Sequence, residues 1–199
     1  MVCLYIYRLT DDTGFAPCVE KGLLSLACCK GGQIRNGKVI NTGLRHRIGV
    51  NREADFTKDE VYILGTYKNK MLYLAKVTNV VTMEEYFDSM SEGRIDDIYD
   101  LVEGNLVRNN HLRAKNVHTA PDRIKKDIAG QYVVLSDNYV YLGADAVSID
   151  SISKYYPNFQ ETKTYFDKEA KFIIDECMKF RDGKKHSPTT PIYKRGCCK

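Results

Sequence analysis

The chain contains no tryptophan, five prolines and no apolar run that approaches the length of a membrane span. A helix that crosses a bilayer needs about 18 or more apolar residues in succession, so we expect no membrane segment. The seven cysteines are odd in number and show no C-x-x-C spacing, which argues against a disulfide framework and a zinc knuckle. With no recognisable secretory signal, this cysteine usage predicts a cytoplasmic protein.

Motifs for nucleotide hydrolysis and for dinucleotide cofactors are missing as well. No G-x-x-x-x-G-K-[ST] or G-x-G-x-x-G run occurs, so neither a phosphate-binding loop nor a bound cofactor is predicted. The four histidines never stand four residues apart, and we predict no metal site. Cys28 and Cys29 are interpreted as small buried residues rather than nucleophiles, since no His-x-Asp arrangement lies near them in the sequence.

Opposite charges are separated along the chain. Residues 21–52 hold seven basic side chains and no acidic one, whereas residues 84–103 hold eight acids against Arg94. Such segregation favours an anion-binding surface on one side and an acidic surface that suits a basic protein partner on the other. Two solvated loops of opposite sign are the alternative reading.

Apolar periodicity predicts an α+β fold. The sequence favours strands at 4–9, a hairpin of strands at 61–67 and 71–80, and strands at 132–135 and 138–142 joined by a short connection or bulge. Helices are expected at 22–31, from Met83 behind a Thr82/Glu85 capping box, and at 164–181. Residues 96–130 are expected to leave the sheet as a long excursion. The predicted organisation is one domain at 1–183 and a basic flexible tail at 184–199.

Several segments resemble one known family in the same order. Gly14-Phe15-Ala16-Pro17 matches its "GFAP" turn, residues 24–35 its "CTLATCKPxIR"-like stretch, residues 104–106 its "GDNIY", and residues 134–143 its "VLISDDFVYFG". The chain therefore resembles the second nucleotide-modification-associated domain family, over about three quarters of its length. At 36–43 it departs from the family's "GDWIIGTG" strand, because the Asp and Trp are absent.

The resemblance implies a fold of the PUA, ASCH and EVE type, which is a small curved β-barrel with flanking helices that binds modified bases in nucleic acid. It implies no particular reaction. The expected partner is therefore a nucleic acid or nucleotide that carries a modified base.

A base-binding pocket needs aromatic rings for stacking, polar groups for the base edge and cations for phosphate. Our candidates for contact with the base are Tyr7, Phe15, Asn105, Ser136, Asp137 and Tyr141. Our candidates for contact with phosphate are Lys30, Arg35 and Arg108. The pocket forms only if the amino-terminal tyrosine strand and the Ser136-Asp137 connection converge in space.

Two other functions stay open. An ASCH-like ribonuclease or base-processing enzyme would use Lys30, Tyr7 and Asp137 for acid–base chemistry at the same pocket. A protein-interaction module would instead use the acidic segment at 84–103. For each strand tyrosine, packing in the sheet is the competing interpretation.

Overall fold

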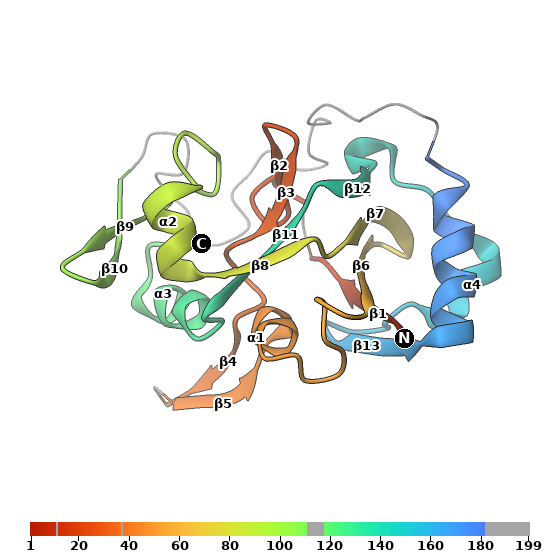
Figure 1. Cartoon of the computed structure of the whole chain (residues 1–199), viewed down its shortest axis with the longest axis horizontal. Helices are drawn as coiled ribbons and strands as arrows, with labels where there is room; N and C mark the ends of the chain where they lie inside the picture. Colours follow the sequence, from red (N-terminus) through yellow and green to blue (C-terminus); the bar gives the residue numbers. More distant parts are fainter. Residues whose placement is uncertain (11, 37, 111–117, 182–199) are drawn as a thin grey trace.

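The protein folds as an α+β structure of several sheets with helices on both outer sides (Figure 1). The structure, a computed structural model, describes residues 1–10, 12–36, 38–110 and 118–181. The predicted tail at 184–199 and the domain boundary at 183 lie outside these ranges. None of the described helices combines the length and the apolar character needed to cross a bilayer.

A five-stranded sheet contains the first strand, between the central strand and one edge strand. Its strand order is β12-β7-β6-β1-β13, with β1 and β6 parallel and the other neighbours antiparallel. The strands are β1 (Val2–Arg8), β6 (Glu60–Tyr67), β7 (Lys70–Lys76), β12 (Asn138–Tyr141) and β13 (Thr162–Phe166). The hairpin β6–β7 confirms the predicted pair, and its turn places Lys68 and Asn69 at positive φ.

Three smaller sheets complete the strands that the structure describes. A four-stranded sheet has the order β2-β3-β11-β8, and β4–β5 and β9–β10 are separate antiparallel pairs. The strands are β2 (Cys18–Glu20), β3 (Leu23–Leu26), β4 (Gly32–Arg35), β5 (Lys38–Thr42), β8 (Asn79–Thr82), β9 (Tyr99–Val102), β10 (Asn105–Arg108) and β11 (Tyr132–Ser136). The helical elements are α1 (Leu44–Gly49), α2 (Met83–Ser89), α3 (Pro121–Ile128), η2 (Gly143–Asp145), η3 (Asp150–Tyr155) and α4 (Asp167–Met178).

Apolar side chains form three layers around the two large sheets. In β1, Tyr5 and Tyr7 enter the cluster between the five-stranded and the four-stranded sheet, whereas Leu4 and Ile6 pack towards α4. Both faces of β1 are thus buried, which explains its nearly continuous apolar sequence. The third cluster joins the other face of the four-stranded sheet to α2 and includes Phe15. Figure 1 shows α2 and α4 near opposite ends of the molecule.

The predicted α+β class is confirmed, but the curved barrel is not what the described residues form. Their strands make separate open sheets, because β11 and β12 pair with different neighbours. The Ser136-Asp137 connection is therefore the crossing point from the four-stranded to the five-stranded sheet, not a bulge within one sheet. The relation to PUA-like domains stays a prediction.

Two predicted helices are wrong in part. Residues 23–26 form β3 between β2 and β11 instead of a helix, because Leu24 and Leu26 fill the space between the large sheets. Residues 162–166 extend the five-stranded sheet beside β1, and the helix begins only at Asp167. The helix from Met83 is confirmed with its complete capping box, and β9, β10 and α3 interrupt the predicted excursion.

Candidate functional site

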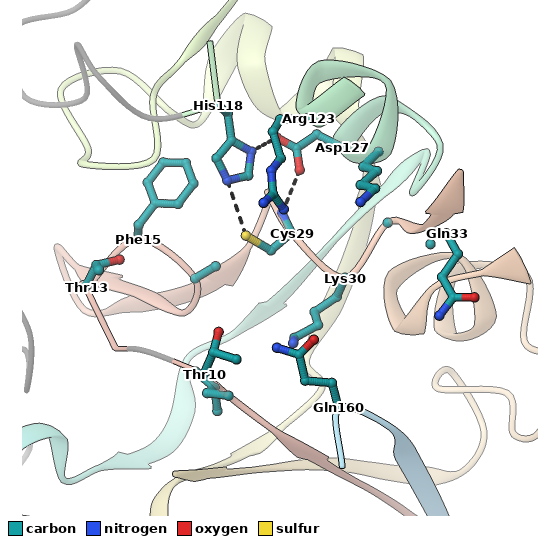
Figure 2. Close-up of a pocket in the computed structure, with 15 residues that line it drawn as sticks. Thr10, Thr13, Phe15, Cys29, Lys30, Gln33, His118, Arg123, Asp127 and Gln160 are labelled. Atoms are coloured by element: carbon teal, nitrogen blue, oxygen red, sulfur yellow. Dashed lines mark hydrogen bonds and ion pairs between the residues drawn. The ribbon is translucent and has the colours of Figure 1, made fainter. Parts of the chain in front are cut away.

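A cavity of about 430 Å³ opens where three loops meet beside α3. Its walls come from the loop that follows β1, from the turn between β3 and β4, and from His118 and α3 (Figure 2). Ligand sites in proteins commonly have volumes of about 300–1,000 Å³, so this cavity has room for a mononucleotide-sized molecule. This cavity is therefore the candidate functional site.

A thiol, an imidazole and a carboxylate stand in line along one wall of this cavity. The Sγ atom of Cys29 lies 3.4 Å from Nε2 of His118, and Nδ1 of His118 contacts Oδ2 of Asp127. A carboxylate only accepts hydrogen bonds, so Nδ1 carries the proton, and in the neutral imidazole Nε2 accepts one from Sγ. Figure 2 shows this chain of contacts as dashed lines.

Asp127 is fixed by two further donors. The backbone N–H of Cys29 donates to Oδ1 at 2.7 Å, and the hydroxyl of Tyr99 donates to Oδ2 at 3.0 Å. Burial raises the pKa of Tyr99, so its phenol keeps its proton and donates the hydrogen bond to Asp127. The Asp127 side chain is 1% exposed and the His118 side chain 2%, whereas Cys29 is half-buried and lines the cavity. The carboxylate and imidazole are therefore held rigidly behind an accessible sulfur atom.

Arg45 ties the three elements behind the site together. This fully buried guanidinium donates to the carbonyl oxygens of Cys29 at 2.8 Å, Tyr132 at 2.6 Å and Asp127 at 2.5 Å. The bonds connect the β3–β4 turn, β11 and α3. One residue from the basic segment thus serves the interior of the site instead of an exposed anion-binding surface.

The turn that carries Cys29 has an unusual backbone. Cys29 and Lys30 are consecutive non-glycine residues at positive φ, 58° and 50°. Such conformations are uncommon for residues with a side chain and concentrate at functional sites. Gly31 follows where a Cβ atom would lie 1.8 Å from the carbonyl oxygen of Lys126, so only glycine lets the turn approach α3 this closely.

Basic side chains dominate the charge of the cavity. Lys30, Arg123 and Lys126 line it, and Asp127 is the single acid among its described lining residues. Arg123 and Lys126 stand three residues apart on α3 and so share one face of that helix. The Nζ atom of Lys30 lies 4.6 Å from the ring centroid of Tyr7, where the ring quadrupole attracts a cation.

Of the residues predicted to contact a base or phosphate, Phe15 and Lys30 line the cavity. Phe15 is only 4% exposed, and its ring centroid lies 5.0 Å from that of His118. Tyr7 lies beneath Lys30 in the core, where its hydroxyl pairs with that of Tyr73 at 2.7 Å. Burial raises the pKa of Tyr7, which does not suit a catalytic proton donor at neutral pH.

The predicted base contacts around the Ser136-Asp137 connection lie in the core or on the surface. Tyr141 is buried, and its hydroxyl donates to Asp12 at 2.6 Å, which anchors the loop that carries Phe15. Ser136 is buried and accepts from the backbone N–H of Asn138 at 3.2 Å. Asp137 is exposed, and its backbone N–H donates to Thr78 at 3.2 Å. None of the three is among the described lining residues of the cavity.

The remaining predicted contacts lie away from the cavity or outside the described side chains. Asn105 is exposed in the β9–β10 hairpin, where its amide donates to the carbonyl oxygen of Glu103 at 3.1 Å. Arg108 donates to the carbonyl oxygens of Ile98, at 3.1 Å, and of Asn109. Arg35 belongs to β4, and its side chain lies outside the described part of the structure.

Part of the acidic segment at 84–103 is internal. Asp96 is fully buried and accepts from Ser25 at 2.5 Å and from Tyr86 at 2.9 Å, beside the guanidinium of Arg94. Burial raises the pKa of Asp96. Asp97 is also buried and accepts from Ser91 at 2.8 Å. The acidic surface available to a protein partner is therefore smaller than the sequence predicts.

Sequence reasoning missed His118 and Asp127 as partners of Cys29. His118 is 89 residues from Cys29, and Asp127 follows it by nine, so no local motif records the arrangement. Asp127 is the only buried residue of α3, but its burial comes from tertiary packing and leaves no signal in the sequence. The run Cys29-Lys30-Gly31-Gly32, which was predicted to end a helix, gave no indication of the partners of Cys29.

A family model described as nucleotide modification associated domain 2 matches residues 1–194. The match includes the turn that carries Cys29, and it also includes His118 and α3. No curated protein and no solved structure matches the chain.

Proposed function

Because the chain belongs to the nucleotide modification associated domain 2 family, we propose that its cavity binds a nucleotide that carries a modified base. The family description links the chain to nucleotide modification, and the cavity provides the chemistry for such a ligand. The observation that carries the proposal is the concentration of Lys30, Arg123 and Lys126 around one cavity with a single acid. The nucleotide is free or is one unit of DNA or RNA.

The basic side chains suit phosphate. Charge-assisted hydrogen bonds from lysine and arginine to phosphate oxygens are shorter and stronger than neutral ones. Arg123 and Lys126 are half-buried on α3 and present two cations from one rigid helix face. Lys30 reaches the cavity from the facing turn, so a phosphate group between the two elements meets positive charge on both sides.

The other walls suit a base. Phe15 and the imidazole of His118 form an apolar wall with a limited accessible surface, so the base packs against their edges rather than lying on a broad aromatic face. Figure 2 shows Thr10 and Gln160 across the cavity from His118 and Thr13 beside Phe15, and these three residues offer hydroxyl and amide groups. Such groups donate and accept hydrogen bonds, which is what recognition of a base edge requires.

Calorimetric titration tests this function. Wild-type protein is titrated with deoxycytidine monophosphate, with 5-hydroxymethyldeoxycytidine monophosphate and with inorganic phosphate. We expect the double substitution Arg123→Ala/Lys126→Ala to weaken mononucleotide binding by about 100-fold or more, because two charge-assisted contacts of about 1.5–3 kcal/mol each are lost.

Lys125→Ala is the matched control. Lys125 is an exposed cation on the same helix and does not line the cavity, so we expect its removal to change affinity by less than about twofold. Equal affinity of the double variant and wild type would refute the cavity as the phosphate site. Equal weakening by Lys125→Ala would point to a general charge effect instead.

A further inference from the structure

We propose that Cys29 is a catalytic nucleophile, activated by His118 and positioned through Asp127, and that it transfers an acyl group carried by a nucleotide. The identity of the acyl carrier rests on the proposed nucleotide-binding function, whereas the chemistry rests on the geometry of the three side chains. Nothing in the sequence or in the family description assigns this activity.

The arrangement has the three parts of a thiol-based catalytic site. The Sγ atom is 3.4 Å from Nε2, which is within reach of a proton transfer between sulfur and imidazole. The carboxylate behind the imidazole fixes the tautomer in which Nε2 faces the sulfur. The sulfur atom also lines a cavity that can admit a substrate. A buried structural cysteine would need none of these features. The neighbouring Cys28 is fully buried and is not among the described lining residues of the cavity.

The position of Asp127 favours an acyl group over a phosphoryl group as the target. Its carboxylate accepts from the backbone N–H of Cys29 at 2.7 Å, so a negative charge stands directly behind the nucleophile. That charge repels a phosphate group from the sulfur atom but does not repel a neutral carbonyl group. In this proposal the three cations that line the cavity bind the phosphate, and the carbonyl carbon faces Sγ.

The reaction balances without an oxidant or any other co-reactant besides water. Nε2 of His118 takes the proton of Sγ, the S–C bond forms, and the carbonyl π electrons move to oxygen. The carbon–leaving-group bond then breaks, and the leaving amine or alcohol takes the proton from Nε2, which leaves a thioester on Cys29. Water gives a proton to Nε2 and attacks the thioester, the C–S bond breaks, and the sulfur recovers a proton. The net change is hydrolysis of the acyl compound to an acid and an amine or alcohol.

p-Nitrophenyl acetate is a suitable probe because it needs no knowledge of the natural substrate. With EDTA present, we expect the full chain to release a stoichiometric burst of p-nitrophenolate and to gain one acetyl group at Cys29, located by peptide mass spectrometry. Cys29→Ala and Cys29→Ser should abolish both signals. Cys28→Ala should keep them, because burial raises the pKa of the Cys28 thiol well above its ordinary value and keeps that thiol unreactive.

Two further variants separate catalysis from structural support. His118→Ala should slow acetylation by about 100-fold, and added imidazole should restore part of the rate because it can occupy the vacated space. Asp127 is a positioning residue, so Asp127→Asn should reverse the tautomer of His118. The ¹⁵N chemical shifts of the imidazole ring measure this change. A merely structural role predicts neither imidazole rescue nor a change of tautomer.

The outcomes distinguish the two proposals. Acetylation confined to Cys197 or Cys198, or an unchanged rate in a folded His118→Ala protein, would overturn the nucleophile assignment even if mononucleotides bind. The Arg123→Ala/Lys126→Ala protein gives the converse case. If it binds mononucleotides as tightly as wild type and Cys29 is still fully acetylated, the nucleotide site is overturned and the nucleophile assignment stands. Circular dichroism on each variant establishes that the loss of a signal comes from the site and not from unfolding.

Discussion

Arg45→Met is expected to lower the free energy of unfolding by about 3 kcal/mol. The guanidinium is fully buried and makes three hydrogen bonds of 2.5–2.8 Å to carbonyl oxygens. Hydrogen bonds from a charged donor contribute about 1.5–3 kcal/mol each. Relief of the desolvation of the cation and burial of the methionine side chain offset roughly half of this loss. Most of the expected loss of stability comes from the three carbonyl groups, which no longer have this donor.

Urea denaturation followed by far-ultraviolet circular dichroism measures this change. A lower midpoint with an unchanged slope would show that stability has fallen without a change in the surface exposed on unfolding. Because Arg45 joins the Cys29 turn to α3, we also expect Cys29 in the folded variant to react differently with iodoacetamide.

Arg52→Met is the matched control from the same basic segment. Its side chain is 61% exposed and its Nε atom lies 3.9 Å from Oε1 of Glu53, so its removal should cost less than about 0.5 kcal/mol. Arg45→Met could instead lower the free energy of unfolding by less than about 1 kcal/mol, or by the same amount as Arg52→Met. Either result would refute the role of Arg45 in holding the three elements behind the site together.

Two other predictions concern tyrosine hydroxyls in the core. Tyr7→Phe and Tyr73→Phe should each lower the free energy of unfolding, measured in urea, by about 1–2 kcal/mol. The double variant should lose less than the sum of the two, because both substitutions remove the same 2.7 Å hydrogen bond. Additive losses would argue against this bond. Tyr141→Phe should cost about 2–3 kcal/mol and weaken mononucleotide binding, since buried Asp12 loses a donor in the loop that carries Phe15. Tyr139→Phe, at a half-buried position, is the control for the latter, and equal effects in both would contradict the anchoring role.

Local patterns were sufficient where the chain makes its own contacts. The capping box of Thr82 and Glu85 marks the start of α2, and the β6–β7 hairpin follows from two β-prone runs around a short turn. Residues 23–26 and 164–166 were misjudged because sheet neighbours far along the chain decide their structure. Propensity cannot register a partner such as β11 for β3 or β1 for β13.

The same reason explains why the site was only partly predicted. Phe15 and Lys30 stand in the segment that the family resemblance singled out, and both line the cavity. Tyr7 and Tyr141 have rings that could stack on a base, yet both are buried in the cluster between the two large sheets, so aromatic residues that fill a core were interpreted as a binding surface. Arg123, Lys126, His118 and Asp127 come from the stretch that periodicity could not interpret.

Asp127 shows why the function of this chain depends on tertiary structure instead of a motif. Its side chain accepts from the backbone of Cys29, from Tyr99 and from His118, and its carbonyl oxygen accepts from Arg45. Because each donor comes from a different segment, the sulfur and the imidazole can meet only after the β3–β4 turn, β9 and α3 have packed together. The hydrogen bonds that stabilise this junction are thus the ones that align Sγ with Nε2, and stability and reactivity at the cavity share a single physical origin.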